Sequence, residues 1–155
     1  MTTIELDFRT ALRDFHGCNM LNMTLSDRSL YLKGLLLLIR KDARVSQSES
    51  ALFKKLGAAL GFNTEFIEDS LREIVTNKHI TDVPPVFSHK AIATLFLRDG
   101  LTLSYSDRDL HSTELGWLKS VALANGLELE AIFDQWQSAF DAGVERELEA
   151  TSLKF

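Results

Sequence analysis

Apolar residues recur along this chain at spacings of three and four positions, with little of the strict alternation that is typical of strands. Spacings of three and four place apolar side chains on one face of a helix. The only two prolines are adjacent, at Pro84-Pro85, inside a segment from Asn77 to Ser88 that is expected to connect two helical halves. The pattern therefore predicts an all-α protein.

We expect about seven helices, four of them before the prolines. The first ends near Gly17, since glycine readily closes a helix. The second runs from a cap at Ser26 or Asp27 to about Lys41. It is apolar almost all round, which indicates a central helix packed on several sides.

The third helix is predicted to begin at a capping box, Ser46-Gln-Ser-Glu49, and to stop at Gly61. Asn63 or Thr64 caps the fourth. Three more helices follow the connector. The sixth is expected to end at Asn125-Gly126, and the last carries Ile132, Phe133, Trp136 and Phe140.

The two halves of the sequence resemble each other. A shift of about 65 positions brings chemically similar residues together, as an internal duplication would. The matched pairs include Asp42 with Asp107, Glu49 with Glu114, Lys54 with Lys119, Gly61 with Gly126 and Ile67 with Ile132. We therefore expect a single domain over residues 1–155, with a core at 28–140 and pseudo-repeat halves at 28–77 and 88–140.

Composition narrows the classes of partner. The 22 acidic residues outnumber the 17 basic ones, and a net charge of −5 disfavours nucleic acid as a partner because phosphates repel it. The longest apolar stretch, Leu35 to Ile39, is far below the roughly 20 residues needed to span a bilayer, so no membrane insertion is expected. The first residues lack a signal-peptide pattern, and the lone Cys18 cannot form an internal disulfide. The cytoplasm is the expected compartment.

Two acidic turns are the main candidate site, because each places an Asp seven residues before a Glu across a predicted helix–helix turn. Hard cations such as Ca²⁺ and Mg²⁺ prefer several converging oxygen ligands. The candidate ligands are Asp42, Glu49, Asp107 and Glu114, with Asp99 and Asp109 in reserve. An EF-hand is excluded, because position 12 of its loop would be Phe53 or Leu118 instead of an acidic residue.

The same residues have a purely structural interpretation. Glu49 closes a capping box, and acidic residues in a first helical turn complement the helix dipole. His111 is either a ligand or a turn residue. A redox protein acting through Cys18 is a third class, which ranks last because no basic neighbour in sequence stabilises a thiolate. No nucleophile elbow, phosphate loop or His-Glu-x-x-His motif occurs, so we do not expect an enzyme.

The segment Arg40-Lys-Asp-Ala-Arg-Val-Ser-Gln-Ser-Glu49 resembles the repeated motif of the TerB-like family, all-helical bacterial domains associated with tellurite resistance and stress operons. In that motif a helix ends in Ala-Asp-Gly, and a Glu opens the next helix after a short spacer. The resemblance extends over roughly residues 28–140. It implies a compact helical domain and divalent-cation binding through Asp42 and Glu49.

This chain departs from the family motif at three points. Ala43 stands where the family usually has Gly, and Arg44 adds a positive charge. In the second copy, Leu97-Arg-Asp-Gly100 resembles the family's helix end, whereas Asp107 keeps the spacing to Glu114, so the homologous residue is either Asp99 or Asp107. The resemblance implies a cytoplasmic, stress-associated binding module with a protein partner. The alternative is a metal-free helical interaction domain, and a homodimer is left open.

Overall fold

A computed structural model describes residues 23–41, 45–76, 80–107 and 110–139, which are helical or irregular and contain no strand. The elements are α2 (Leu25–Lys41), α3 (Gln47–Ala59), α4 (Thr64–Thr76), α5 (Lys90–Ser104), the 3-10 helix η2 (Tyr105–Asp107) and α6 (Ser112–Ala124). Residues 129–139 are also helical. The all-α prediction is confirmed for these ranges. The helix expected before Gly17 lies outside them, so the count of seven stays a prediction.

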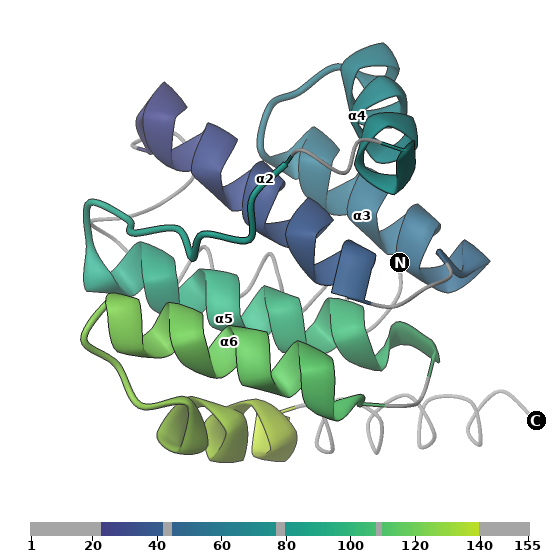
Figure 1. Ribbon diagram of the computed structural model, residues 1–155. Helices are drawn as coiled ribbons and strands as arrows, with labels where there is room; N and C mark the ends of the chain where they lie inside the picture. The colour runs from purple at the N-terminus through teal and green to yellow at the C-terminus, as the bar shows by residue number, and fades with distance from the viewer. Residues whose placement is uncertain (1–22, 42–44, 77–79, 108–109, 140–155) are drawn as a thin grey trace, which may run out of the picture.

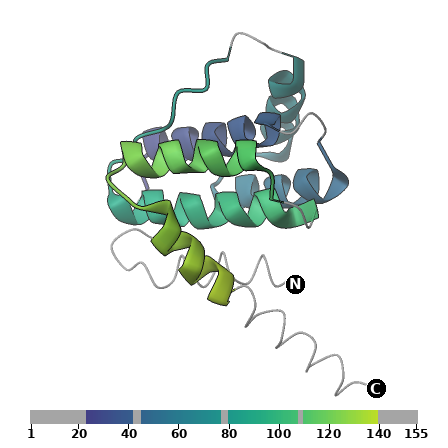
Figure 2. The ribbon, with the colours of Figure 1, turned by 60° about the horizontal axis from the view of Figure 1, so that its bottom comes forward.

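Helix α2 is the centre of the fold. It contacts α3, α4, α5 and α6, and Leu35, Leu38 and Ile39 are completely buried along it. Figure 1 shows α5 and α6 side by side, with α2 crossing above them and α3 and α4 beyond it. The helix of residues 129–139 lies at the opposite edge, below α5 in Figure 2. The expectation of a central second helix is confirmed.

The helix starts recur at a constant interval. Leu25 and Lys90 begin α2 and α5, and Gln47 and Ser112 begin α3 and α6, each pair 65 residues apart. The helical run at 129–139 likewise begins 65 residues after α4. The order of helices in the first half therefore repeats in the second.

Two glycines end equivalent helices. Gly61 follows α3 with φ 93° and Gly126 follows α6 with φ 71°, a left-handed conformation that suits glycine because it has no Cβ. Both helix stops were predicted from sequence, and both are confirmed. Each glycine lets the chain turn sharply into the next helix.

Side-chain caps fix three helix starts. The capping box of Ser46 and Glu49 is present at α3, and the Phe66 amide donates to Asn63 Oδ1 at 2.8 Å at the start of α4. The predicted cap of α2 is wrong. The Asp27 amide donates to Thr24 Oγ1 at 3.0 Å, which makes Thr24 the cap and places Asp27 inside the first turn.

Aromatic side chains fill the space between α2, α5 and α6. The rings of Tyr31 and Phe96 meet edge to face with centroids 5.2 Å apart, and Phe96 in turn packs on Trp117. Gly34 makes room for this cluster, because a Cβ there would lie 2.6 Å from Phe96 Cε1.

Among the described helices, none has the length and apolarity needed to cross a membrane.

Candidate functional site

Glu49 and Glu114 occupy the same position in two equivalent helices. Each is the third residue of its helix, and each side chain is only 2% exposed. The Glu49 amide donates to Ser46 Oγ at 3.0 Å, and the Ser46 amide donates to Glu49 Oε1 at 3.3 Å. At α6 the cap is His111, whose side chain makes no capping hydrogen bond. The two turns therefore share the buried glutamate but differ in their caps.

The two helix starts that carry these glutamates lie at the same end of the molecule. In Figures 1 and 2 the end of α2 and the start of α3 lie near the end of α5 and the start of α6. The 3-10 helix η2, which leads out of α5, packs against α3. The fold therefore places the starts of α3 and α6, which carry Glu49 and Glu114, at the same end of the described helices.

Asp99 lies away from the turns, inside α5, where its carboxylate accepts a hydrogen bond from the Tyr31 hydroxyl of α2. Leu97-Arg-Asp-Gly100 resembles the family's helix end, but here α5 continues to Ser104. Gly100 serves close packing instead. A Cβ at Gly100 would lie 2.8 Å from Leu118 Cδ2 of α6.

The remaining predicted ligands are only partly covered. Asp42 and Asp109 lie outside the described residues, and Asp107 is placed only as the last residue of η2. Within the described part of the chain, no three His, Cys, Asp or Glu side chains gather closely enough to hold a metal ion. Of the predicted ligands, Glu49 and Glu114 are described with their side chains, at the starts of α3 and α6.

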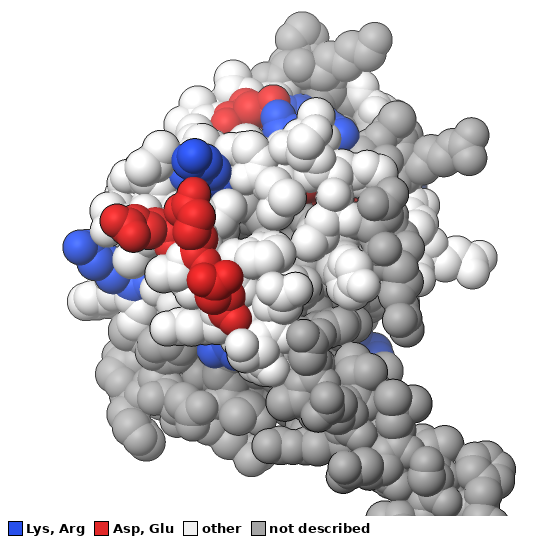
Figure 3. Space-filling view, turned by 90° about the horizontal axis from the view of Figure 1, so that it is seen from below, with Lys and Arg blue, Asp and Glu red and all other residues white. Residues whose placement is uncertain are grey.

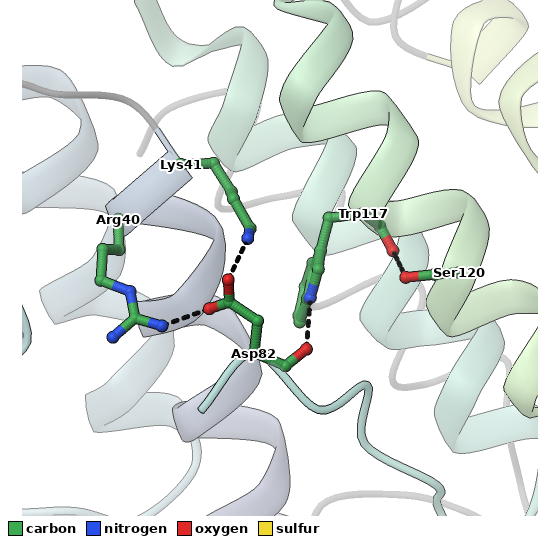
Figure 4. Close-up of polar contacts among 5 residues, drawn as sticks. All are labelled: Arg40, Lys41, Asp82, Trp117 and Ser120. Atoms are coloured by element: carbon green, nitrogen blue, oxygen red, sulfur yellow. Dashed lines mark hydrogen bonds and ion pairs between the residues drawn. The ribbon is translucent and has the colours of Figure 1, made fainter. Parts of the chain in front are cut away.

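The connector between the halves is fastened to two helices, α2 and α6. At one end, the Asp82 carboxylate pairs with Arg40 and Lys41 at the end of α2, and the Asp82 carbonyl accepts from Trp117 Nε1 at 3.1 Å (Figure 4). The hydrogen bond from Lys41, supported by the one from Arg40, outweighs partial burial and lowers the pKa of Asp82. These contacts join α2 and α6 through one irregular residue.

Asn125, just past α6, holds the middle of the connector. Its Nδ2 donates to the Pro85 carbonyl at 2.9 Å and to the Val121 carbonyl at 2.8 Å, and its Oδ1 accepts from the Phe87 amide at 2.9 Å. Three hydrogen bonds satisfy nearly all the capacity of one amide side chain. Sequence analysis treated Asn125 only as a helix end and missed this role.

Asp27 holds the far end of the connector from the first turn of α2. Its Oδ1 accepts from the Ser88 amide at 3.0 Å, and its Oδ2 accepts from the hydroxyls of Ser88 and Thr24. Burial raises the pKa of Asp27, but the hydrogen bonds from Ser88 and Thr24 lower it by more, so the net pKa is lowered. No sequence signal linked Asp27 to a residue 61 positions later.

A groove of about 380 Å³ lies between α6 and the helix of residues 129–139. We call it the α6 groove. It is lined by Leu115, Gly116 and Lys119 of α6 and by Leu129, Glu130, Phe133 and Asp134. Leu115 and Phe133 are half-buried, whereas Glu130 and Asp134 are exposed at its rim. The groove thus combines an apolar floor with charged edges.

Comparison with known proteins returned no matching family model, no matching curated protein and no matching solved structure. The TerB-like resemblance therefore rests on the sequence alone, chiefly on the motif from Arg40 to Glu49.

Proposed function

We propose that this chain is a non-catalytic, stress-associated binding module of the TerB-like type, in which Ca²⁺ or Mg²⁺ binds between the two acidic turns. The observation that supports the cation site is the matched placement of Glu49 and Glu114, both 2% exposed at the same position of equivalent helices. Asp42, Asp107 and Asp109 would complete the ligand set. Asp99 is omitted, because its carboxylate is engaged by Tyr31 inside the core.

Burying a carboxylate is costly unless its charge is compensated. The backbone amides and dipole of a helix N-terminus offset that cost. A divalent cation shared between Glu49 and Glu114 would add a favourable interaction for both side chains at once and join the two halves. Since Ca²⁺ and Mg²⁺ take six or more oxygen ligands, turn residues and water would supply the others. Bound cation would bias how the halves sit against each other and hence which protein partner is held.

Thermal melts of the metal-stripped protein test this function. A ligand at a hundredfold excess over its Kd stabilises the native state by about 2.7 kcal/mol. For a domain of this size that free energy corresponds to a rise in Tm of roughly 5–10 °C. A rise with Ca²⁺ or Mg²⁺ that EDTA reverses supports the proposal. An unchanged Tm with both cations contradicts it.

A metal-free helical interaction domain is the second candidate. It is favoured by the capping box, in which Glu49 already accepts the Ser46 amide and so has a structural role without any cation. Pull-down from cytoplasmic extract in EDTA separates the two functions. A partner retained in EDTA supports the metal-free domain, and a partner released by EDTA supports the cation-dependent module.

A further inference from the structure

The α6 groove can be compared with an equivalent helix pair in the same chain, because α3 and α4 precede α6 and the helix of residues 129–139 by 65 positions. Where the groove has Leu115, Leu129 and Phe133, the first half has Ser50, Thr64 and Glu68. Its charged positions are kept, since Lys119, Glu130 and Asp134 correspond to Lys54, Glu65 and Asp69. The helix pair therefore folds with polar residues at these positions, so the apolar floor is particular to the second half.

Gly116 gives the groove an open side. It lies inside α6 and is exposed, and a Cβ added there would meet no atom within 4 Å among the described residues. Internal packing therefore does not require a glycine at this position. A glycine in a helix interior is less favourable than alanine, but it allows another backbone to approach closely.

The charged residues around the α6 groove indicate the charge of the partner that would bind there. Glu128, Glu130 and Asp134 are exposed, and Lys119 Nζ lies 3.8 Å from Glu130 Oε1. Figure 3 shows acidic side chains in a row on this face, with uncharged surface on one side and Lys or Arg side chains at its upper end and on its other side. Residues 1–22 carry three acidic and two basic side chains, and residues 140–155 carry four and two, so neither end of the chain complements the acidic rim.

We propose that the α6 groove docks an amphipathic helix of a partner protein, with apolar side chains three or four residues apart and Lys or Arg on its flanks. Apolar anchors of the partner enter between Leu115, Leu129 and Phe133, and its backbone approaches Gly116. The basic flanks pair with the acidic rim. The surface extends the binding module proposed above but does not depend on a bound cation.

The probe is a labelled peptide containing two copies of the heptad Leu-Lys-Lys-Leu-Leu-Lys-Leu. Its controls are a scrambled peptide of the same composition and a peptide with Glu in place of each Lys. Affinity is measured by fluorescence anisotropy on the full chain, and the site is located by amide chemical shifts. Gly116→Leu adds a side chain to the groove from a position where a Cβ meets no atom within 4 Å, and Ala51→Leu is its exposed counterpart 65 residues earlier.

The proposal predicts binding of the amphipathic Lys peptide alone, with shifts in α6 and residues 129–139. Gly116→Leu should weaken binding by about tenfold or more, and Ala51→Leu should not. Glu130→Lys should also weaken binding, unlike its counterpart Glu65→Lys. Glu49→Gln should lose the response to cations and keep its affinity for the peptide. That result would show that the cation site and the α6 groove act independently.

Three results would overturn the proposal. They are equal binding of the scrambled peptide, peptide affinity unaffected by Gly116→Leu, and a change of amide shifts in residues 1–22 or of oligomeric state caused by Gly116→Leu without peptide. Changed amide shifts in residues 1–22 would assign the groove to the chain's own N-terminal segment. A changed oligomeric state would assign it to a second copy of the chain.

Discussion

Tyr31 of α2 donates its hydroxyl hydrogen to the Asp99 carboxylate of α5, so a charged hydrogen bond joins two core helices. Tyr31 is completely buried and Asp99 is 5% exposed. Burial, followed by the negative charge of Asp99, raises the pKa of Tyr31 well above its ordinary value. The phenol therefore stays protonated and remains a donor at neutral pH.

Removing this donor should destabilise the fold. Tyr31→Phe keeps the ring but takes a hydrogen bond from a buried carboxylate, at a cost of about 1–3 kcal/mol in the free energy of unfolding. Asp99→Asn should cost a similar amount. Because both variants remove one interaction, the double variant should lose less than the sum of the single losses, as measured by urea unfolding. Strictly additive losses would contradict a direct Tyr31–Asp99 bond.

Asn125 should matter more than Asp82 for holding the connector. Asn125→Ala leaves the Phe87 amide and the Pro85 carbonyl without their buried partner and should cost about 2–3 kcal/mol. Asp82→Ala removes ion pairs of a side chain that is 46% exposed, so it should cost less than about 1 kcal/mol. Chemical denaturation measures the loss of stability in both variants, and hydrogen exchange of the Phe87 amide measures how firmly each variant holds the connector. The reverse order of losses would show that the connector is held mainly by its ion pairs.

Two helical glycines should respond oppositely to alanine. A Cβ at Gly100 would press on Leu118, so Gly100→Ala should destabilise by about 1–3 kcal/mol. A Cβ at Gly116 meets open space, so Gly116→Ala should stabilise by about 0.5–1 kcal/mol through helix propensity. Thermal melts of the two variants provide the comparison. A loss of stability in Gly116→Ala would contradict the open geometry of the α6 groove.

Acid should weaken the fastening of the connector. The pKa of Asp27 is lower in the folded chain than in the unfolded one, so its stabilising contribution is full above the unfolded value of about 3.9 and is lost as the pH falls through the folded value. The free energy of unfolding should therefore decrease as the pH falls below about 5. Asp27→Asn should reduce this dependence, as measured by urea unfolding across pH. An unchanged pH profile in Asp27→Asn would contradict the role of the charged side chain.

Local signals account for what the sequence predicted correctly. The capping box at Ser46 and the left-handed stops at Gly61 and Gly126 each depend on a few neighbouring residues, so they can be recognised in the sequence alone. Local signals do not reveal the role of Gly100. Its neighbours resemble a helix end, but its role is set by Leu118 on another helix.

Long-range pairs could not be predicted. Tyr31 and Asp99 are 68 positions apart, and Asn125 reaches Pro85 across 40 positions. Which side chains meet across such distances depends on how the helices pack, and periodicity indicates only which face is buried. Part of the candidate site could be predicted from the sequence, because the repeat alone suggested that Glu49 and Glu114 would be equivalent.

Calorimetric titration of the metal-stripped protein with Ca²⁺ and Mg²⁺ tests most directly whether the two acidic turns form one site. Wild type is compared with Glu49→Gln and Glu114→Gln, in which Gln can keep the capping geometry but removes the charge. Ser46→Ala is the control, because it breaks the capping box and leaves every carboxylate. The account predicts one cation per chain, lost in either Gln variant and retained in Ser46→Ala. Absence of binding in the wild type, or binding unchanged in both Gln variants, would contradict it.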